Sequence, residues 1–328
     1  MIKAILTQTC LILGGGGFIG AALADQLLTE GWVVRIFDRS GVRPFRSFEP
    51  HERIEWIEGD FGDLAAVRAA LRGVDAVVHL ISTTLPRQSN EAPVADVQSN
   101  VLGSLQLLQE MVTQGIRRIV FASSGGTVYG RPMQLPIQED HPTQPEVSYG
   151  ISKLMIEKYL YLFSQLHGIR PISLRIANPY GGRQRIDTAQ GAVAVFLHRA
   201  LRNETVEIWG DGSVVRDYLH VDDVASALSA ALRYDGRHQV INIGAGRGLS
   251  LNALLDEIEA LLNRKVARHF LPGRGFDVPV SVLDISLARA ELGWSPCISL
   301  TDGLRLTLSA QEIDARANPH LFDVRSPP

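Results

Sequence analysis

The stretch CLILGGGGFIGAAL at residues 10–23 decides the fold of this chain. Four apolar residues come first, and Gly14, Gly17 and Gly20 follow with the spacing G-x-x-G-x-x-G before a helical pattern begins. Glycine has no Cβ atom, so the backbone can turn tightly and approach a pyrophosphate, whose charge is stabilised by the N–H groups at the helix start. Gly20 should also let helix and strand pack closely. The stretch therefore predicts a strand, a phosphate-binding turn and a helix.

The same alternation continues through the first half of the chain. Short apolar runs lie at residues 10–13, 33–37, 54–57, 76–79, 118–122 and 171–176, and helical patterns such as 17–30 and 64–71 lie between them. Strands that alternate with helices are typical of a parallel sheet covered on both faces. We therefore expect an α/β fold with a doubly wound parallel sheet of the Rossmann type.

The rhythm changes after Asn178, which predicts a second, smaller α/β domain. A helix near 193–201 and an extended run at 205–209 leave the sheet, whereas a helix at 221–233 and a strand at 240–243 favour a return to it before the helices at 252–263 and 286–292. We expect a dinucleotide-binding domain of residues 1–177 with 214–250 returning to it, a substrate domain of 178–213 and 251–316, and a tail of 317–328 with little to pack.

The composition argues against several classes of protein. The chain of 328 residues has a net charge of −3 and is 45% hydrophobic, which is ordinary for a folded protein and favours no nucleic-acid partner. Cys10 and Cys297 are far apart, so we expect neither a disulfide framework nor a metal site. Because the sequence has no apolar run of eighteen residues and no leader-like start, we expect a cytoplasmic protein without membrane contact.

Acidic residues follow the second and third predicted strands. Asp38 stands where a carboxylate would bind the ribose diol of a dinucleotide and repel a 2′-phosphate, which favours NAD over NADP. The neighbouring Arg39 and Arg43 would suit a 2′-phosphate, and Asp38 could alternatively be a solvated loop acid. After the third strand, Asp60 could bond the adenine amine with Phe61 packed beside it, or Asp60 could cap a helix.

The sequence Tyr149-Gly-Ile-Ser-Lys153 begins a helical pattern and brings a phenol and an ammonium onto one face. A phenol with a pKa of about 10 needs roughly 4 kcal/mol of anion stabilisation to titrate near 7, which the ammonium and a cationic nicotinamide could provide. Tyr149 is therefore a candidate proton carrier. The alternative is that the tyrosine packs in the core and the lysine is solvated.

Taken together, these pieces resemble the extended short-chain dehydrogenase/reductase superfamily, and within it the NAD-dependent epimerase/dehydratase family of UDP-glucose 4-epimerase type. The resemblance covers nearly the whole chain. It rests on the glycine turn, Gly59-Asp60, Val77-Val-His-Leu80, Ser123-Ser124 before Val128-Tyr-Gly130, the Tyr149–Lys153 pair, Asn178-Pro179 and Arg216-Asp-Tyr218.

The resemblance implies a catalytic set of Ser124, Tyr149 and Lys153, in which Ser124 binds a sugar hydroxyl and Lys153 also holds the nicotinamide ribose. The loop that follows Ser124 is one residue longer than is usual in the family, so Ser123 or Thr127 could take the place of Ser124. The implied NAD contacts are Gly14, Gly17, Phe18, Ile19, Gly20, Asp38, Arg39, Asp60, Phe61, Leu80, Ile81, Ser82, Asn100, Ser123, Tyr149 and Lys153.

The resemblance also implies a nucleotide-sugar site. Arg216 and Arg274 would hold the UDP diphosphate, and Asp277 would contact the uridine ribose. Val195 stands where the family has an asparagine, which leaves the nucleotide base open. The implied substrate contacts are Ser124, Asn178, Val193, Trp209, Arg216, Arg274, Asp277 and Ser281, and the small Ser281 would admit N-acetylated sugars.

The function implied is C4 epimerisation of a UDP-hexose through a transient 4-keto sugar, with polysaccharide biosynthesis as one use. A 4,6-dehydratase is disfavoured because Gly125 and Gly126 occupy the positions where that family has Asp-Glu. Reductases, uronate epimerases, decarboxylases and a non-catalytic NAD-binding sensor stay open. The resemblance further implies a homodimer that pairs helices near 101–112 and 153–166.

Overall fold

The computed structural model describes residues 8–184, 191–273 and 278–317. Its centre is a seven-stranded sheet with the order β10-β6-β5-β4-β1-β2-β3, in which every neighbouring pair is parallel. The strands are β1 Thr9–Leu13, β2 Val33–Asp38, β3 Ile54–Glu58, β4 Ala76–His79, β5 Arg118–Ser124, β6 Arg170–Ile176 and β10 Val240–Ile243. The predicted doubly wound α/β fold is therefore confirmed.

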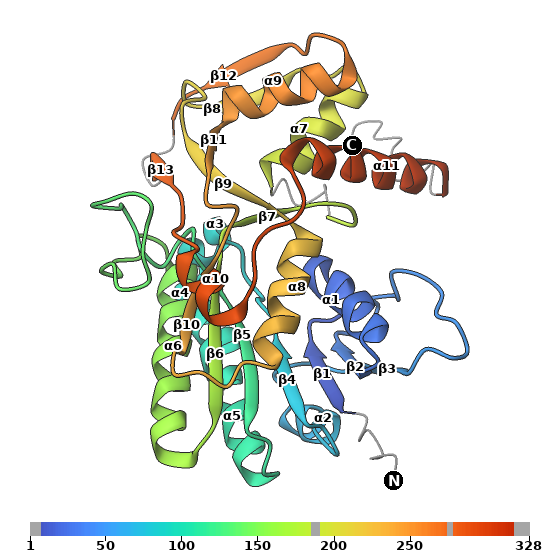
Figure 1. Cartoon of the computed structure of the whole chain (residues 1–328), viewed down its shortest axis with the longest axis vertical. Coiled ribbons are helices and arrows are strands. Elements are labelled where there is room, and N and C mark those ends of the chain that lie inside the picture. Colours follow the sequence, from blue (N-terminus) through green and yellow to red (C-terminus); the bar gives the residue numbers. More distant parts are fainter. Residues whose placement is uncertain (1–7, 185–190, 274–277, 318–328) are drawn as a thin grey trace.

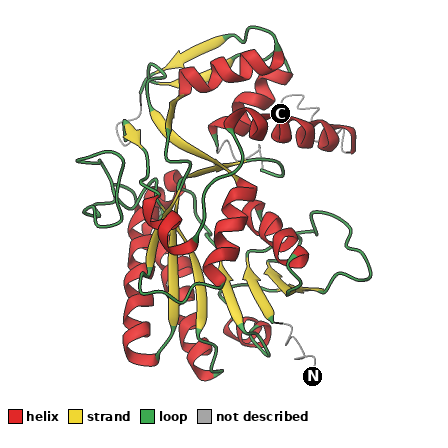
Figure 2. Cartoon of the chain, viewed as in Figure 1, coloured by secondary structure: helices red, strands yellow, loops and turns green. Residues whose placement is uncertain are grey.

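Helices cover both faces of this sheet (Figure 2). One face packs against α1 Phe18–Thr29 and α8 Val221–Leu232, and the other against α2 Leu64–Ala70, α5 Gly103–Thr113 and α6 Ser148–His167. The central strands are continuous apolar runs because both of their faces are buried, as in β4, whose four residues are all buried. The order of the strands reverses between β1 and β4, and ligands of such sheets bind at the carboxyl ends near that point.

The second part of the molecule lies beyond the carboxyl ends of these strands (Figure 1). Its four-stranded sheet contains β7 Asn178–Tyr180, β9 Val215–His220, β11 Gly248–Ser250 and β13 Val280–Ser281, and a separate parallel pair joins β8 Val206–Trp209 to β12 Arg268–Leu271. Helices α7 Ala192–Leu201, α9 Leu251–Leu262 and α11 Leu300–Ala317 share a core with these strands.

The predicted return of residues 214–250 holds only for α8 and β10. Strands β9 and β11 fall in the same range but belong to the four-stranded sheet, where they pair with each other. The chain thus crosses between the two parts more often than the sequence pattern indicated, and the division into domains stays a prediction.

Several short elements are not anticipated by the sequence pattern. They are α3 Pro86–Glu91, α4 Pro93–Asp96 and the π-helical turn η1 Val97–Leu102, each too short to show a periodic apolar pattern. Helix α10 Ser286–Leu292, by contrast, lies at its predicted place and packs on β10. Within the described residues, none of the helices combines the length and apolar character that crossing a membrane requires. The predicted tail lies outside the described residues from residue 318 onward.

Candidate active site

The glycine turn connects β1 to α1 at the carboxyl edge of the sheet. Gly14 N donates to Phe37 O at 2.8 Å, and Gly17 N donates to Gly14 O at 3.1 Å, which closes the turn. A Cβ atom on Gly20 would lie 2.4 Å from Gly14 O, so the helix can approach the strand this closely only with glycine there. Gly17 gives α1 no side-chain cap, so the start of the helix suits an anionic group. This cradle fits the pyrophosphate of a dinucleotide.

Asp38 lies beside the glycine turn at the end of β2. Its Oδ2 accepts a hydrogen bond from Gly16 N at 2.9 Å, and its Oδ1 accepts one from Arg39 N at 2.9 Å. The carboxylate is half-buried rather than a solvated loop acid, whereas Arg39 is exposed. The place of Asp38 beside the turn fits the ribose of NAD.

The structure excludes one of the two predicted roles of Asp60, which follows β3. Asp60 Oδ1 accepts from Gly62 N, whereas the N-cap of α2 is Asp63, whose side chain accepts from Ala65 N at 2.8 Å. Asp60 is therefore not the helix cap, which leaves the contact to adenine as its predicted role. Phe61 is buried and its ring lies 5.2 Å from that of His79.

Asn100 fixes the loop that comes after β4. Its Oδ1 accepts from Thr83 N at 2.9 Å, so this side chain positions the loop that carries Ser82. Ile81 meets the glycine turn, because a Cβ on Gly14 would lie 3.2 Å from Ile81 Cγ1. The predicted cofactor contacts Leu80, Ile81 and Ser82 therefore lie next to the turn, and Ile19 packs into the core beneath it.

Tyr149 and Lys153 lie in the first two turns of α6, as predicted. Lys153 Nζ donates to Ala122 O at 2.8 Å and lies 5.6 Å from the centroid of the Tyr149 ring. Burial lowers the pKa of Lys153 to about 8, and burial raises the pKa of Tyr149 to about 12 despite a hydrogen bond with Ser82. The chain alone therefore does not lower the pKa of Tyr149, and a bound oxidised nicotinamide would add positive charge that favours the tyrosinate.

The structure separates the three candidate hydroxyls near the end of β5. Ser123 is buried, and its Oγ donates to Glu157, which forms a buried ion pair with Arg175 at 2.7 Å. Ser124, on the opposite face of the strand, is only partly buried. Thr127 Oγ1 is buried and has no hydrogen-bond partner among the described residues. Among the described residues, the hydroxyls of Ser124 and Thr127 thus have no hydrogen-bond partner, although that of Thr127 is buried, whereas the Ser123 hydroxyl is already engaged.

The two glycines after Ser124 have different surroundings. A Cβ on Gly125 would lie 2.5 Å from Leu283 Cδ1, so a side chain there would have to displace Leu283, whereas a Cβ on Gly126 would meet only Asn178 Oδ1 at 4.0 Å. Asn178 Nδ2 donates to Asp217 O at 3.3 Å, which places its amide between the loop and β9. The predicted substrate residue Asn178 therefore faces the same loop as Ser124.

The remaining predicted substrate residues lie in the second part. Arg216 is partly buried on β9 and its Nη1 donates to Val278 O at 2.6 Å. Trp209 is 40% exposed at the end of β8, whereas Val193 is 1% exposed in the core. Ser281 pairs with Arg216 in the sheet register. The predicted residues Arg274 and Asp277 lie outside the described residues.

The first turn of α6 depends on residues that the sequence pattern did not single out. Its N-cap, Val147, has no side-chain acceptor. Instead, Asn90 Oδ1 accepts from Ser148 N at 2.8 Å and Ser89 Oγ accepts from Tyr149 N at 2.9 Å. No local signal could have found this cap, since Ser89 and Asn90 precede α6 by about sixty residues and lie in the short α3.

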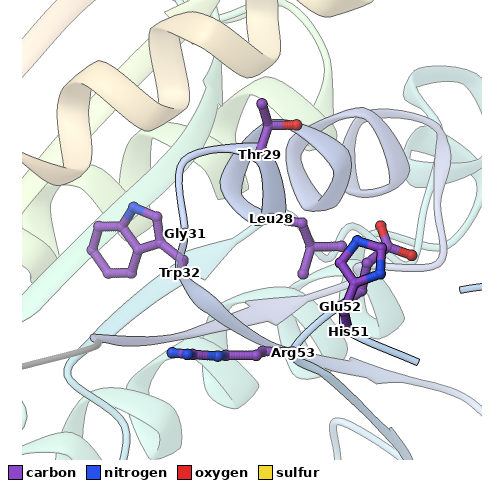
Figure 3. A pocket seen from close by; sticks show the side chains of 7 residues that line it. All are labelled: Leu28, Thr29, Gly31, Trp32, His51, Glu52 and Arg53. Carbon is purple, nitrogen blue, oxygen red and sulfur yellow. The ribbon is translucent and has the colours of Figure 1, made fainter. Parts of the chain in front are cut away.

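A surface hollow of about 370 Å³ lies elsewhere (Figure 3). It lies at the amino ends of β2 and β3, the edge of the sheet opposite to the glycine turn, and Glu52 on its wall is paired with Arg46. Its lining is Leu28, Thr29, Gly31, Trp32, His51, Glu52 and Arg53. The hollow is therefore no part of the candidate active site.

A glycine cradle, an acid after β2 and a Tyr149–Lys153 pair at the carboxyl edge of one parallel sheet define a dehydrogenase/reductase of the short-chain class. The family model for the NAD dependent epimerase/dehydratase family matches residues 10–244. The chain belongs to this family, and NAD is its cofactor.

Curated relatives carry two different activities in their names. The chain is 36% identical over 301 residues to the dTDP-4-dehydro-6-deoxyglucose reductase of Escherichia coli, covering 90% of this chain and 94% of the relative. It is 34% identical over 303 residues to the UDP-glucose 4-epimerase of Mycolicibacterium smegmatis, covering 91% of this chain and 96% of the relative. Because a reductase and an epimerase are about equally similar to this chain, identity alone does not choose between the two activities.

Solved structures agree on the fold over almost the whole chain. The UDP-glucose 4-epimerase of Thermotoga maritima with UDP-glucose superposes with a TM-score of 0.88 at 33% identity, covering 93% of this chain and 99% of that one. The UDP-glucose 4-epimerase of Thermus thermophilus, complexed with NAD, gives a TM-score of 0.85 at 31% identity, covering 93% and 99%.

Proposed function

We propose that the chain is a UDP-hexose 4-epimerase that interconverts UDP-glucose and UDP-galactose through a transient 4-keto sugar. The observation that carries the proposal is the Tyr149–Lys153 pair at the start of α6, in which Lys153 donates to Ala122 of β5, two residues before Ser124. The similarity to the epimerases of Mycolicibacterium smegmatis and Thermotoga maritima supports this assignment.

In the proposed reaction, Tyr149 takes the proton of the C4 hydroxyl while Ser124 holds the C4 oxygen. NAD, which the glycine turn and Asp38 would hold, would supply the hydride acceptor and donor for C4. Tyr149 then gives its proton back to the C4 oxygen, and the charge of Lys153 stabilises the tyrosinate whenever it forms. Because the proton and the hydride both return, NAD is regenerated in each cycle and no net reductant is consumed.

The second part of the molecule anchors the nucleotide in this proposal. Arg216 would bind the diphosphate and Asn178 would contact it from the loop side, while Trp209 would border the base. Arg274 is proposed to bind the diphosphate as well, and Asp277 is proposed to bind the ribose. Anchoring far from C4 lets the hexose present either face to the cofactor, because the binding free energy comes from the part that does not react.

A reductase is the second candidate, because the Escherichia coli relative bears that name at 36% identity. It would transfer hydride once and release oxidised cofactor. A dehydratase would need an acid and a base in the loop, where this chain has Gly125 and Gly126. Asp38 beside the turn disfavours the 2′-phosphate of NADPH, which suits an enzyme that recycles NAD.

One incubation distinguishes these activities. Purified protein is mixed with UDP-glucose, UDP-galactose, their N-acetyl and uronic acid forms and a 4-keto-6-deoxy nucleotide sugar, and products are followed by NMR with and without NAD or NADH. Interconversion at C4 without loss of NADH supports the epimerase. Consumption of NADH with the keto sugar makes the chain a reductase, a 4-keto-6-deoxy product makes it a dehydratase, and unchanged sugars contradict an enzyme for these substrates.

We also propose that the chain forms a homodimer through α6 and the η1–α5 segment. Apolar side chains are exposed on both elements, and on α6 they recur along the helix at a spacing that a partner helix could cover. They are Leu102, Ile151, Tyr161, Leu162 and Leu166, with 49%, 47%, 59%, 42% and 65% of their surface exposed. Sedimentation of wild type and Leu166→Glu tests the proposal, and a monomeric wild type contradicts it.

A further inference from the structure

Asp96 is a fully buried carboxylate that the proposed reaction does not use. It ends α4 and has 0% of its surface exposed. Its Oδ1 accepts from Asn100 Nδ2 at 2.9 Å and from Thr84 Oγ1, and its Oδ2 accepts from Ser152 Oγ at 2.6 Å and from Ser148 Oγ at 2.9 Å. Four donors from three segments therefore converge on one buried anion.

No described cation compensates this charge by a direct ion pair. Lone charges are expensive to bury, and here hydroxyl and amide donors alone satisfy the carboxylate. Although burial raises it, the pKa of Asp96 stays below its ordinary value because the hydrogen bonds, led by that of Ser152, favour the ionised form. The start of α6 lies against the carboxylate, and a helix N-terminus also favours an anion. Asp96 is therefore charged at neutral pH.

The residues that Asp96 binds surround the candidate catalytic pair in sequence. Ser148 precedes Tyr149, and Ser152 precedes Lys153, so the carboxylate joins the first and second turns of α6. Through Asn100 the same carboxylate reaches the loop after β4, whose Ser82 hydrogen-bonds Tyr149. One side chain thus ties the start of α6 to the loop whose Ser82 hydrogen-bonds Tyr149.

The electrostatic environment of Lys153 explains why this charge matters. Burial lowers the pKa of Lys153 to about 8, and the charges of Asp96 and Glu157 oppose that loss. Glu157 is paired with Arg175 of β6, and burial lowers the pKa of His79 of β4 to about 3, so His79 is neutral. Among the described charged groups, Asp96 is the uncompensated anion that keeps Lys153 protonated at neutral pH.

We propose that Asp96 is a positioning residue, which fixes Tyr149 through the two serines of α6 and holds the charge of Lys153 from its buried site. The proposal rests on the proposed roles of Tyr149 and Lys153. A negative charge favours the ammonium and disfavours the tyrosinate, so its removal shifts the titration of both groups to lower pH.

Lysine NMR measures this effect without any substrate. The chain has lysine at 4 positions, Lys3, Lys153, Lys158 and Lys265, so the ¹³Cε signals are few and Lys153→Arg assigns the relevant one. In Asp96→Asn the hydroxyls can rotate to accept from the amide, which keeps the shape and removes the charge. We expect the Lys153 midpoint, near pH 8 in the wild type, to fall by about one unit. An unchanged midpoint would overturn the electrostatic role.

Two further variants separate charge from position. Asp223→Asn is the matched control, since Asp223 is also a buried carboxylate but accepts from Cys297 N and Ile298 N instead of from α6, and it should leave the Lys153 midpoint unchanged. The variant Ser148→Ala leaves Ser152, Thr84 and Asn100 bound to the carboxylate, so it should keep the charge of Asp96 and the Lys153 midpoint and lower kcat about tenfold by loosening Tyr149. A wild-type kcat in that variant contradicts the positioning role. If the wild type turns over no substrate but the Lys153 midpoint still falls in Asp96→Asn, only the proposed function is contradicted.

Discussion

The candidate cofactor site on the large sheet and the candidate substrate site in the second part of the molecule differ in how their residues are arranged along the sequence. The proposed phosphate and ribose contacts of the cofactor are close in sequence, because Gly14, Gly17, Gly20 and Asp38 all lie within the β1–α1–β2 unit. The proposed substrate residues of the second part come from β7, β9 and β13, which are 3, 6 and 2 residues long. A site that depends on a local backbone shape is thus encoded locally, whereas the proposed sugar site is assembled from segments far apart in the sequence.

The variant Tyr149→Phe should have the largest effect, because it removes the one group proposed to move a proton and leaves the cofactor site intact. We expect kcat to fall about 1000-fold, since general acid–base groups contribute factors of about 10² to 10⁴. Binding of NAD should persist, because the glycine turn is untouched. Steady-state kinetics and cofactor content check this, and Tyr159→Phe on the same helix is the control. A fall of less than tenfold would remove Tyr149 from the proposed role.

Gly20→Ala should disrupt the glycine turn of the cofactor site through steric overlap alone. Its Cβ would lie 2.4 Å from Gly14 O, so the turn has to shift, and we expect a loss of roughly 3 kcal/mol in the free energy of unfolding together with weaker NAD binding. Gly17→Ala places a Cβ 3.2 Å from the same oxygen and should cost less than half as much. Denaturant unfolding measures both, and equal losses would show that the contact at Gly20 is not special.

The same contrast explains which features the sequence could predict. The fold, the turn and the Tyr149–Lys153 pair depend on patterns within a few residues of one another, where spacing alone fixes geometry. The cap of α6 by Ser89 and Asn90 and the network around Asp96 depend on contacts across about fifty to sixty residues, and α3 and α4 have no periodic pattern. The raised pKa of Tyr149 in the chain alone could not be predicted for a related reason, since its burial depends on the whole fold.

Arg216→Ala removes a proposed diphosphate contact of the substrate site and should have a smaller effect on activity than Tyr149→Phe. If Arg216 binds the diphosphate in ground state and transition state alike, KM for UDP-glucose rises about tenfold while kcat changes little. Arg199→Ala, on α7 and paired with Glu207, is the control for loss of a surface charge. A fall in kcat at unchanged KM would indicate that Arg216 acts on the reacting sugar instead of anchoring the nucleotide.

The smallest expected effect concerns the choice of sugar at Ser281. Leu283, two residues further on, contacts the position of Gly125, and side chains alternate along an extended chain, so Ser281 faces the same side as the loop after Ser124. A bulkier residue at this position should therefore extend toward that loop. In Ser281→Tyr we expect the rate with UDP-N-acetylglucosamine, relative to that with UDP-glucose, to fall about tenfold.

A ratio of two rates is the right measurement for this variant, because Ser281 is 5% exposed and a tyrosine could destabilise the fold by overpacking. Any general loss of folded protein lowers both rates equally and cancels in the ratio. Ser281→Ala, which removes the hydroxyl without adding bulk, should leave the ratio as in the wild type. If Ser281→Tyr also leaves it unchanged, room at this position does not select the sugar, and the open space beside Gly126 becomes the next position to fill with a side chain.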